Sequence, residues 1–176
     1  MKKFLMIALS LMMVLSVAAA AGETSDMTTL KVNKVFTIQS KIPEGYSYQL
    51  IIDEELYMIG MLTGDAGKPQ VTISIAYNEE YDDVERFNDV DEATVEQIKD
   101  SFLEMDEGVV FEDVETAYGT RLLKATDPEK DFVDIYTIYK SYELEFVLTP
   151  GAEPLSDADV QMLVDFISDM EFVPAA

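Results

Sequence analysis

The chain contains neither cysteine nor histidine, and these two absences exclude most familiar catalytic centres. Without these residues there can be no Ser-His-Asp triad, Cys-His pair, HExxH helix or cysteine zinc site. Disulfides and thiolate chemistry are excluded as well. A lipoprotein anchor is also excluded, because it requires a cysteine at the cleavage site. We therefore expect no enzymatic activity and no cofactor, and a fold that is stabilised by packing alone.

Positive charge is scarce, with 12 Lys and Arg against 35 Asp and Glu and a formal net charge of −23. Nucleic acids and anionic membranes both attract clustered Lys and Arg, so neither is an expected partner. A basic protein, a cell-envelope component or a cation suits this surface better, although the charge can also serve solubility alone. The only arginines, Arg86 and Arg121, are expected to form structural ion pairs among so many carboxylates.

Long apolar runs are confined to the N-terminus. Two lysines precede an apolar run over residues 4–17, and small residues follow it. This pattern is typical of a secretory signal peptide over residues 1–21, cleaved after Ala20 or Ala21. The run is shorter than the ~20 residues that span a bilayer, so we expect cleavage rather than anchoring. Cleavage would leave 10 cations against 35 acids, a charge of −25, on a secreted or periplasmic protein.

The remaining chain has the length of one domain, with no repeat, low-complexity segment or linker rich in Pro, Gly or Ser. We expect a flexible polar lead over residues 22–33 and a single domain over residues 34–174. Alternating apolar positions predict eight strands in that domain. Their ranges are 35–42, 46–52, 56–62, 71–77, 109–115, 120–126, 132–139 and 142–149.

Two segments change to the spacing of an amphipathic helix. In the first, Asp91 is the expected N-cap and the apolar stripe runs from Val95 to Met105. In the second, Ser156 is the N-cap with Asp159 three residues later, which is the pattern of a capping box. Tight turns between the strands predict an antiparallel sheet of about seven strands, packed with two main helices as an α+β sandwich. The phosphate-binding motifs of parallel sheets do not occur.

The order of elements, with Ile42-Pro43-Glu44-Gly45-Tyr46 after the first strand and Ile167 to Phe172 leading into a closing strand, resembles the PsbP-like fold. That fold occurs in photosystem accessory proteins and in many exported bacterial proteins. The resemblance covers about residues 35–173 and implies a non-catalytic accessory or binding domain that acts through its surface. It carries over no site residue. Metal binding in some photosynthetic members uses histidine in part, which this chain lacks.

Eight acidic residues gather within residues 79–92, between a predicted strand and a predicted helix. Oxygen ligands suit calcium, and the candidate ligands are Asp82, Asp83, Asp89, Asp91 and Glu92. The EF-hand pattern fails, because Ala93 stands at its fifth position and Thr94 at the position of the required glycine. A solvated, acid-rich approach to a helix N-terminus is the favoured interpretation.

Tyrosines near two predicted turns are the candidates for partner contact. They are Tyr118, Tyr136, Tyr139 and Tyr142. Aromatic side chains on both faces of a strand could line a groove, but packing on the sheet with the phenol ends in water is the favoured interpretation. The residues thus favour an exported binding domain. The alternative is a carboxylate-based, glycosidase-like hydrolase. Two desolvated acids that face each other in a concave pocket would support this alternative. A broad apolar patch on one sheet face would favour a partner instead.

Overall fold

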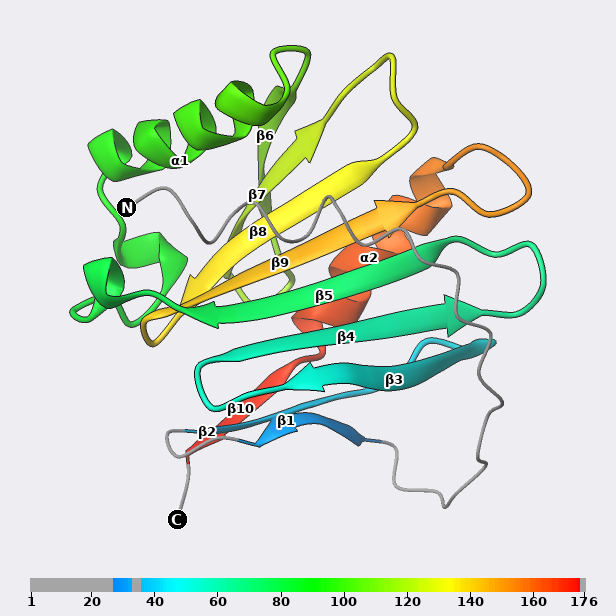
Figure 1. Cartoon of the computed structure of the whole chain (residues 1–176), viewed down its shortest axis with the longest axis horizontal. Helices are drawn as coiled ribbons and strands as arrows, with labels where there is room; N and C mark the ends of the chain where they lie inside the picture. The colour runs from blue at the N-terminus through cyan, green and yellow to red at the C-terminus, as the bar shows by residue number, and fades with distance from the viewer. Residues whose placement is uncertain (1–26, 33–35, 175–176) are drawn as a thin grey trace.

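The computed structural model describes residues 27–32 and 36–174, and it confirms an α+β fold with antiparallel sheets (Figure 1). The expected signal peptide over residues 1–21 and its cleavage site lie outside the described residues. Two helices and ten strands form within them. Neither helix in this part of the chain is long and apolar enough to cross a membrane.

Seven strands form the main sheet, in the order β3-β4-β5-β9-β8-β7-β6 with every neighbouring pair antiparallel. The strands are β3 (Tyr46–Asp53), β4 (Tyr57–Gly64), β5 (Gln70–Tyr77), β6 (Val110–Glu115), β7 (Arg121–Thr126), β8 (Val133–Tyr139) and β9 (Tyr142–Thr149). Hairpins build each half, and β5 beside β9 joins the two halves. The strand positions agree with the alternation in the sequence to within a few residues.

A second sheet of three strands was not expected from the sequence. It consists of β1 (Thr28–Val32), β2 (Phe36–Ser40) and β10 (Glu171–Pro174), in the order β1-β2-β10. The β1 strand lies inside the segment expected to be a polar lead. The closing strand β10 pairs with β2, with Phe172 opposite Ile38, so it joins the small sheet rather than the main one.

Local signals in the sequence explain where several elements begin. Gly45 has a φ of +77°, which glycine adopts freely, and the N–H of Tyr46 donates to the carbonyl of Pro43 at 3.0 Å to close the turn before β3. Helix α1 (Glu92–Met105) begins with the side chain of Asp91 accepting from the N–H of Thr94 at 2.9 Å. Helix α2 (Asp157–Ser168) begins with the expected capping box.

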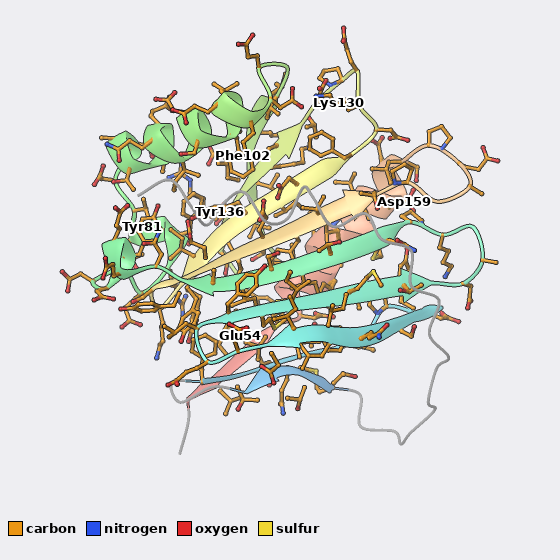
Figure 2. All side chains as sticks on the ribbon, in the orientation of Figure 1. Glu54, Tyr81, Phe102, Lys130, Tyr136 and Asp159 are labelled. Carbon is orange, nitrogen blue, oxygen red and sulfur yellow. The ribbon has the colours of Figure 1, made fainter. Side chains whose placement is uncertain are left out.

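The two helices cover opposite faces of the main sheet (Figure 1). Helix α2 and the small sheet pack on one face, where Phe146 of β9 meets Phe166 of α2. Helix α1 packs on the other face over β7 and β8, and Figure 2 shows its Phe102 beside Tyr136 of β8. Because successive side chains of a strand point to opposite faces, Ile135 belongs to the first core and Tyr136 to the second.

Candidate binding cleft

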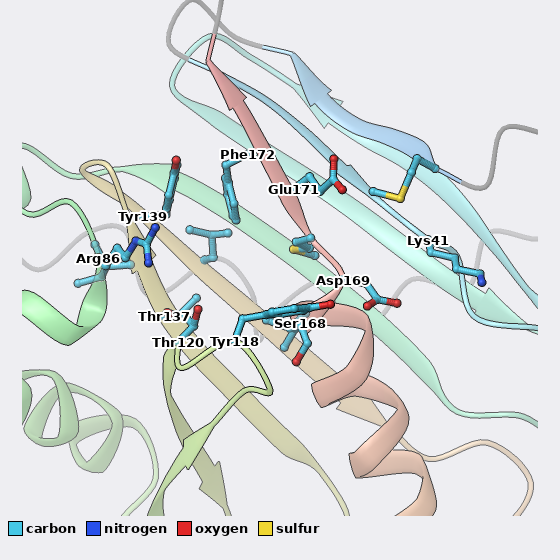
Figure 3. A pocket seen from close by; sticks show the side chains of 15 residues that line it. Lys41, Arg86, Tyr118, Thr120, Thr137, Tyr139, Ser168, Asp169, Glu171 and Phe172 are labelled. Atoms are coloured by element: carbon cyan, nitrogen blue, oxygen red, sulfur yellow. The ribbon is translucent and has the colours of Figure 1, made fainter.

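A cleft of about 630 Å³ lies where the small sheet meets one end of the main sheet (Figure 3). Strand β10 and the last turn of α2 form one wall. The end of β8, the turn between β6 and β7, and Arg86 form the opposite wall. The cleft therefore exists because β10 returns from α2 to pair with β2 rather than with the main sheet.

Two stacked aromatic rings form part of the cleft lining. The rings of Tyr139 and Phe172 lie 3.9 Å apart between centroids at an interplanar angle of 27°. The buried ring of Phe36 meets both of them edge-on, at 5.5 Å and 5.7 Å. Aromatic pairs of this kind are worth about 0.5–1.5 kcal/mol beyond the area that they bury. The pair thus joins the two sheets and gives the cleft a rigid apolar surface.

Tyr118 projects from the turn between β6 and β7, and 75% of it is exposed. The turn itself is firmly held: the hydroxyl of Thr116 accepts from the N–H groups of Tyr118 and Thr120 at 3.3 Å and 3.1 Å. Gly119 takes a φ of +78°, and its carbonyl accepts from the amide of Asn88 at 3.0 Å. A large aromatic side chain is therefore presented to solvent by a fixed backbone.

Arg86 lines the cleft without an ion pair to any described residue. Its backbone is fixed, because its N–H donates to Asp89 Oδ2 at 3.2 Å and the residue forms an isolated antiparallel β-bridge with Tyr139. Arg121 differs, with its Nε 2.6 Å from Asp113 Oδ1 and its Nη1 3.0 Å from Glu92 Oε1. The expectation of a structural ion pair is therefore confirmed for Arg121 and wrong for Arg86.

A second cation, Lys41, lies at the other end of the cleft beside Asp169 (Figure 3), and it too forms no ion pair within the described part of the chain. Asp169 and Glu171 contribute two carboxylates to the same cleft. Two cations against two acids make the cleft locally neutral. The rest of the molecule is strongly negative, so the cleft differs from the surrounding surface in carrying no excess negative charge.

The structure brings two of the four candidate tyrosines together. Tyr118 and Tyr139 both line the cleft beside β10. Tyr142 is buried against Phe36, with ring centroids 5.0 Å apart. Tyr136 packs on the opposite face of the sheet in the core under α1, but its phenol end does not reach water as expected: the residue is 1% exposed and its hydroxyl donates to Glu143 at 2.7 Å. The four side chains therefore do not form one surface.

Tyr142 also reaches a second cleft, of about 450 Å³, on the other side of the turn between β8 and β9. Acidic side chains predominate there, from Glu55, Asp82 and Glu85, with Lys140 as the one cation of its lining. The hydroxyl of Tyr77 donates to Asp82 Oδ1 at 2.5 Å inside this cleft.

Four of the five calcium candidates have separate interaction partners. Asp82 accepts from Tyr77, Asp89 from the N–H of Arg86, and Asp91 from the N–H of Thr94. Glu92 pairs with Arg121, while Asp83 is exposed. Among the residues that the structure describes, no three or more acidic side chains are grouped so that they could hold a metal ion. Calcium binding by this segment stays a prediction.

Two buried carboxyl groups were not recognised in the sequence. Asp134 of β8 and Glu145 of β9 are neighbours on the face of the sheet that carries α1, with exposures of 3% and 8%. Burial raises the pKa of Asp134 well above its usual range, and the charge of Glu145 raises it further. Burial also raises the pKa of Glu145. A protonated Asp134 can then donate to the Glu145 carboxylate, which satisfies two acids with one proton.

The local sequence hides this pair. Asp134 and Glu145 occupy the polar positions of alternating strands, where an outward-facing acid is the ordinary expectation. One oxygen of Asp134, Oδ1, has no hydrogen-bond partner. Neither of the two clefts is lined by Asp134 or Glu145.

Comparison with known proteins finds no match to a family model, to a curated protein or to a solved structure. The resemblance to the PsbP-like fold therefore stays a prediction.

Proposed function

We propose that this protein is an exported, non-catalytic binding domain that holds its partner in the cleft beside β10. The observation that carries the proposal is the composition of that cleft: an exposed tyrosine, a stacked aromatic pair and an arginine without a carboxylate partner. Tyrosine and arginine are enriched among the residues that dominate the free energy of protein–protein binding. The partner is a protein or another component of the cell envelope.

The energetics of Tyr118 and Arg86 support a role in binding. An exposed tyrosine on a fixed turn contributes little to folding, yet it loses little conformational freedom when a partner covers it. Arg86 could lower its free energy by pairing with one of the many acids, but its fixed backbone leaves it in the cleft. Both side chains are thus available to a partner without a rearrangement of the fold.

Capture from the extracellular and envelope fractions of the source cells tests this proposal. The bait proteins are the wild type, a Tyr118→Ser/Arg86→Gln double variant, and Val110→Ser as control. Val110 is 56% exposed at the end of β6 remote from the Tyr118 turn, so its replacement also removes exposed apolar surface. We expect wild type and control to capture the same partner and the double variant to lose at least about tenfold in affinity. Equal capture by all three proteins would contradict binding in this cleft.

The buried pair of Asp134 and Glu145 supports the alternative, a carboxylate-based hydrolase, because a raised pKa suits a general acid. Binding is placed first because neither described cleft gives a substrate access to the pair. Release of reducing ends from a panel of polysaccharides would support the hydrolase if Glu145→Gln abolished it. No release by the wild type would remove this alternative.

A further inference from the structure

We infer that the cleft binds an extended peptide, which adds a fourth strand to the small sheet at β10 and places one carboxylate against Arg86. This inference rests on the proposed function and names the chemistry of the partner. The ligand is a segment with a single acidic side chain near its centre, apolar side chains beside it, and otherwise neutral or basic residues.

The free edge of β10 supplies the backbone contacts. In the order β1-β2-β10, β10 is an edge strand: one side pairs with β2, and the other pairs with no strand among those described. In an antiparallel strand, alternate residues direct their N–H and C=O groups to opposite sides, so two of the four residues of β10 present unpaired backbone groups at the free edge, and Pro174 has no N–H to donate. Glu171 and Phe172 of this strand line the cleft. An extended segment lying in the cleft can therefore pair with β10.

The apolar surface next to that edge accommodates side chains of an added strand. Phe172 lies on the inner face of the small sheet, opposite Ile38 and stacked on Tyr139. Neighbouring strands place their paired side chains on the same face, about 5 Å apart. An apolar side chain on the added strand next to Phe172 would thus contact the aromatic pair. Tyr118 lies across the cleft, where it can cover the peptide.

The charges around the cleft favour a peptide with one acidic side chain over a peptide with many. Arg86 stands beside Tyr139 on the wall opposite β10 and has no ion pair within the described chain (Figure 3). A carboxylate there would form a charge-assisted hydrogen bond to the guanidinium. The net charge of −23 repels a ligand of high negative charge, and Asp169 and Glu171 on the β10 side favour basic neighbours.

Binding to an array of immobilised peptides of about nine residues tests the side-chain part of the inference. Each peptide has apolar alternation and Asp, Asn or Lys at its centre, with lysines near both ends. The proteins are the wild type, Arg86→Gln and, as control, Lys99→Gln, which removes a cation on α1 paired with Glu96. We expect wild type and Lys99→Gln to prefer Asp over Asn by about tenfold, and Arg86→Gln to lose this preference.

Backbone methylation of the best Asp peptide tests the added strand. Methyl groups on alternate N–H groups in one register would block pairing with β10, whereas the other register directs its N–H groups away from the edge. We expect loss of binding for one register only. In the complex, hydrogen exchange of the β10 amides should slow, while exchange in β6, the far edge strand of the main sheet, should not change.

Three outcomes would overturn the inference. They are equal affinity for Asp and Asn peptides, equal tolerance of both methylation registers, and a dimer of the free protein in solution that buries β10 of both copies. If one of these occurred while the Tyr118→Ser/Arg86→Gln variant still lost its captured partner, the cleft would remain the binding site and the strand-addition mode alone would be wrong. If that variant kept both its binding to the peptides and its captured partner, the proposed function itself would be contradicted.

Discussion

At the scale of single residues, the turn between β8 and β9 is a point of strain beside the cleft. Lys140 and Ser141 have φ values of +47° and +66°, in the left-handed region that residues other than glycine adopt at a cost. Contacts offset that cost: the N–H of Lys140 donates to the carbonyl of Glu85 at 3.1 Å, and the N–H of Asn78 to that of Ser141 at 2.8 Å. The turn fixes Tyr139 and Tyr142 at its two ends.

Ser141→Gly should therefore stabilise the protein. Glycine removes the steric cost of the left-handed conformation, which is about 1 kcal/mol, without removing a backbone hydrogen bond. A gain of this size corresponds to a rise in melting temperature of about 2–4 °C for a domain of this length. Thermal unfolding followed by circular dichroism measures it, with Ser101→Gly in the middle of α1 as the contrasting variant that loses stability. A lower melting temperature for Ser141→Gly would show that the serine side chain stabilises the turn.

The interaction partners of individual residues were the property that the sequence predicted least well. Arg121 pairs with Asp113, eight residues earlier on the neighbouring strand β6, and with Glu92, 29 residues earlier at the start of α1. The backbone bridge that fixes Arg86 in the cleft involves β8, about 50 residues later in the chain. Asp134 and Glu145 are likewise neighbours only because β8 pairs with β9 in one register. Both cases depend on tertiary placement, which local patterns do not encode.

At the scale of elements, the sequence predicted those whose signals are local. The capping box of α2 is an example: Ser156 accepts from the N–H of Asp159 at 3.4 Å, and Asp159 Oδ2 accepts from the N–H of Ser156 at 2.9 Å. The small sheet was missed because its three strands come from both ends of the domain. Strand β10 has only four residues, and the choice between the two sheets depends on contacts with Phe36 and Tyr139.

Ser156→Ala should destabilise the protein by about 1 kcal/mol, because the Asp159 N–H loses the Ser156 hydroxyl as its acceptor and that hydroxyl no longer donates to Asp159 Oδ2. The hydrogen bond from the backbone N–H of Ser156 to Asp159 Oδ2 remains. Helix α2 covers the larger core and leads directly into β10, so the loss should also increase hydrogen exchange in β10. Chemical denaturation measures the first effect and exchange followed by mass spectrometry the second. Ser101→Ala, at an exposed position of α1, should leave both nearly unchanged. Unaltered stability of Ser156→Ala would show that the cap is not needed.

At the scale of the whole molecule, most of the excess negative charge lies on exposed surface, whereas Asp134 and Glu145 are buried and Glu143 is partly buried on two neighbouring strands of the main sheet. Burial raises the pKa of Asp134, Glu143 and Glu145. Glu143 also accepts from the hydroxyl of Tyr136 at 2.7 Å, which lowers its pKa in part. All three lie on the α1 face of β8 and β9.

The protein should consequently be more stable at pH 5 than at pH 8. A carboxyl whose pKa is raised on folding keeps its proton in the native state above the pH at which the unfolded chain releases it, so stability falls as pH rises from the unfolded value towards the folded one. Self-repulsion of the net negative charge acts in the same direction. Asp91, Asp106 and Asp113 oppose the trend only at lower pH, because hydrogen bonds lower their pKa below the usual 3.8.

Asp134→Asn separates the buried pair from the surface charge. An amide at this position can donate to Glu145 at any pH without titrating, so the variant should lose part of the difference in melting temperature between pH 5 and pH 8. Asp100→Asn removes an exposed acid from α1 and should leave most of that difference in place. Melting curves of the three proteins at both pH values, repeated at high salt to screen the surface charges, measure the two contributions. A wild type equally stable at both pH values would show that Asp134 and Glu145 do not share a proton in the native state.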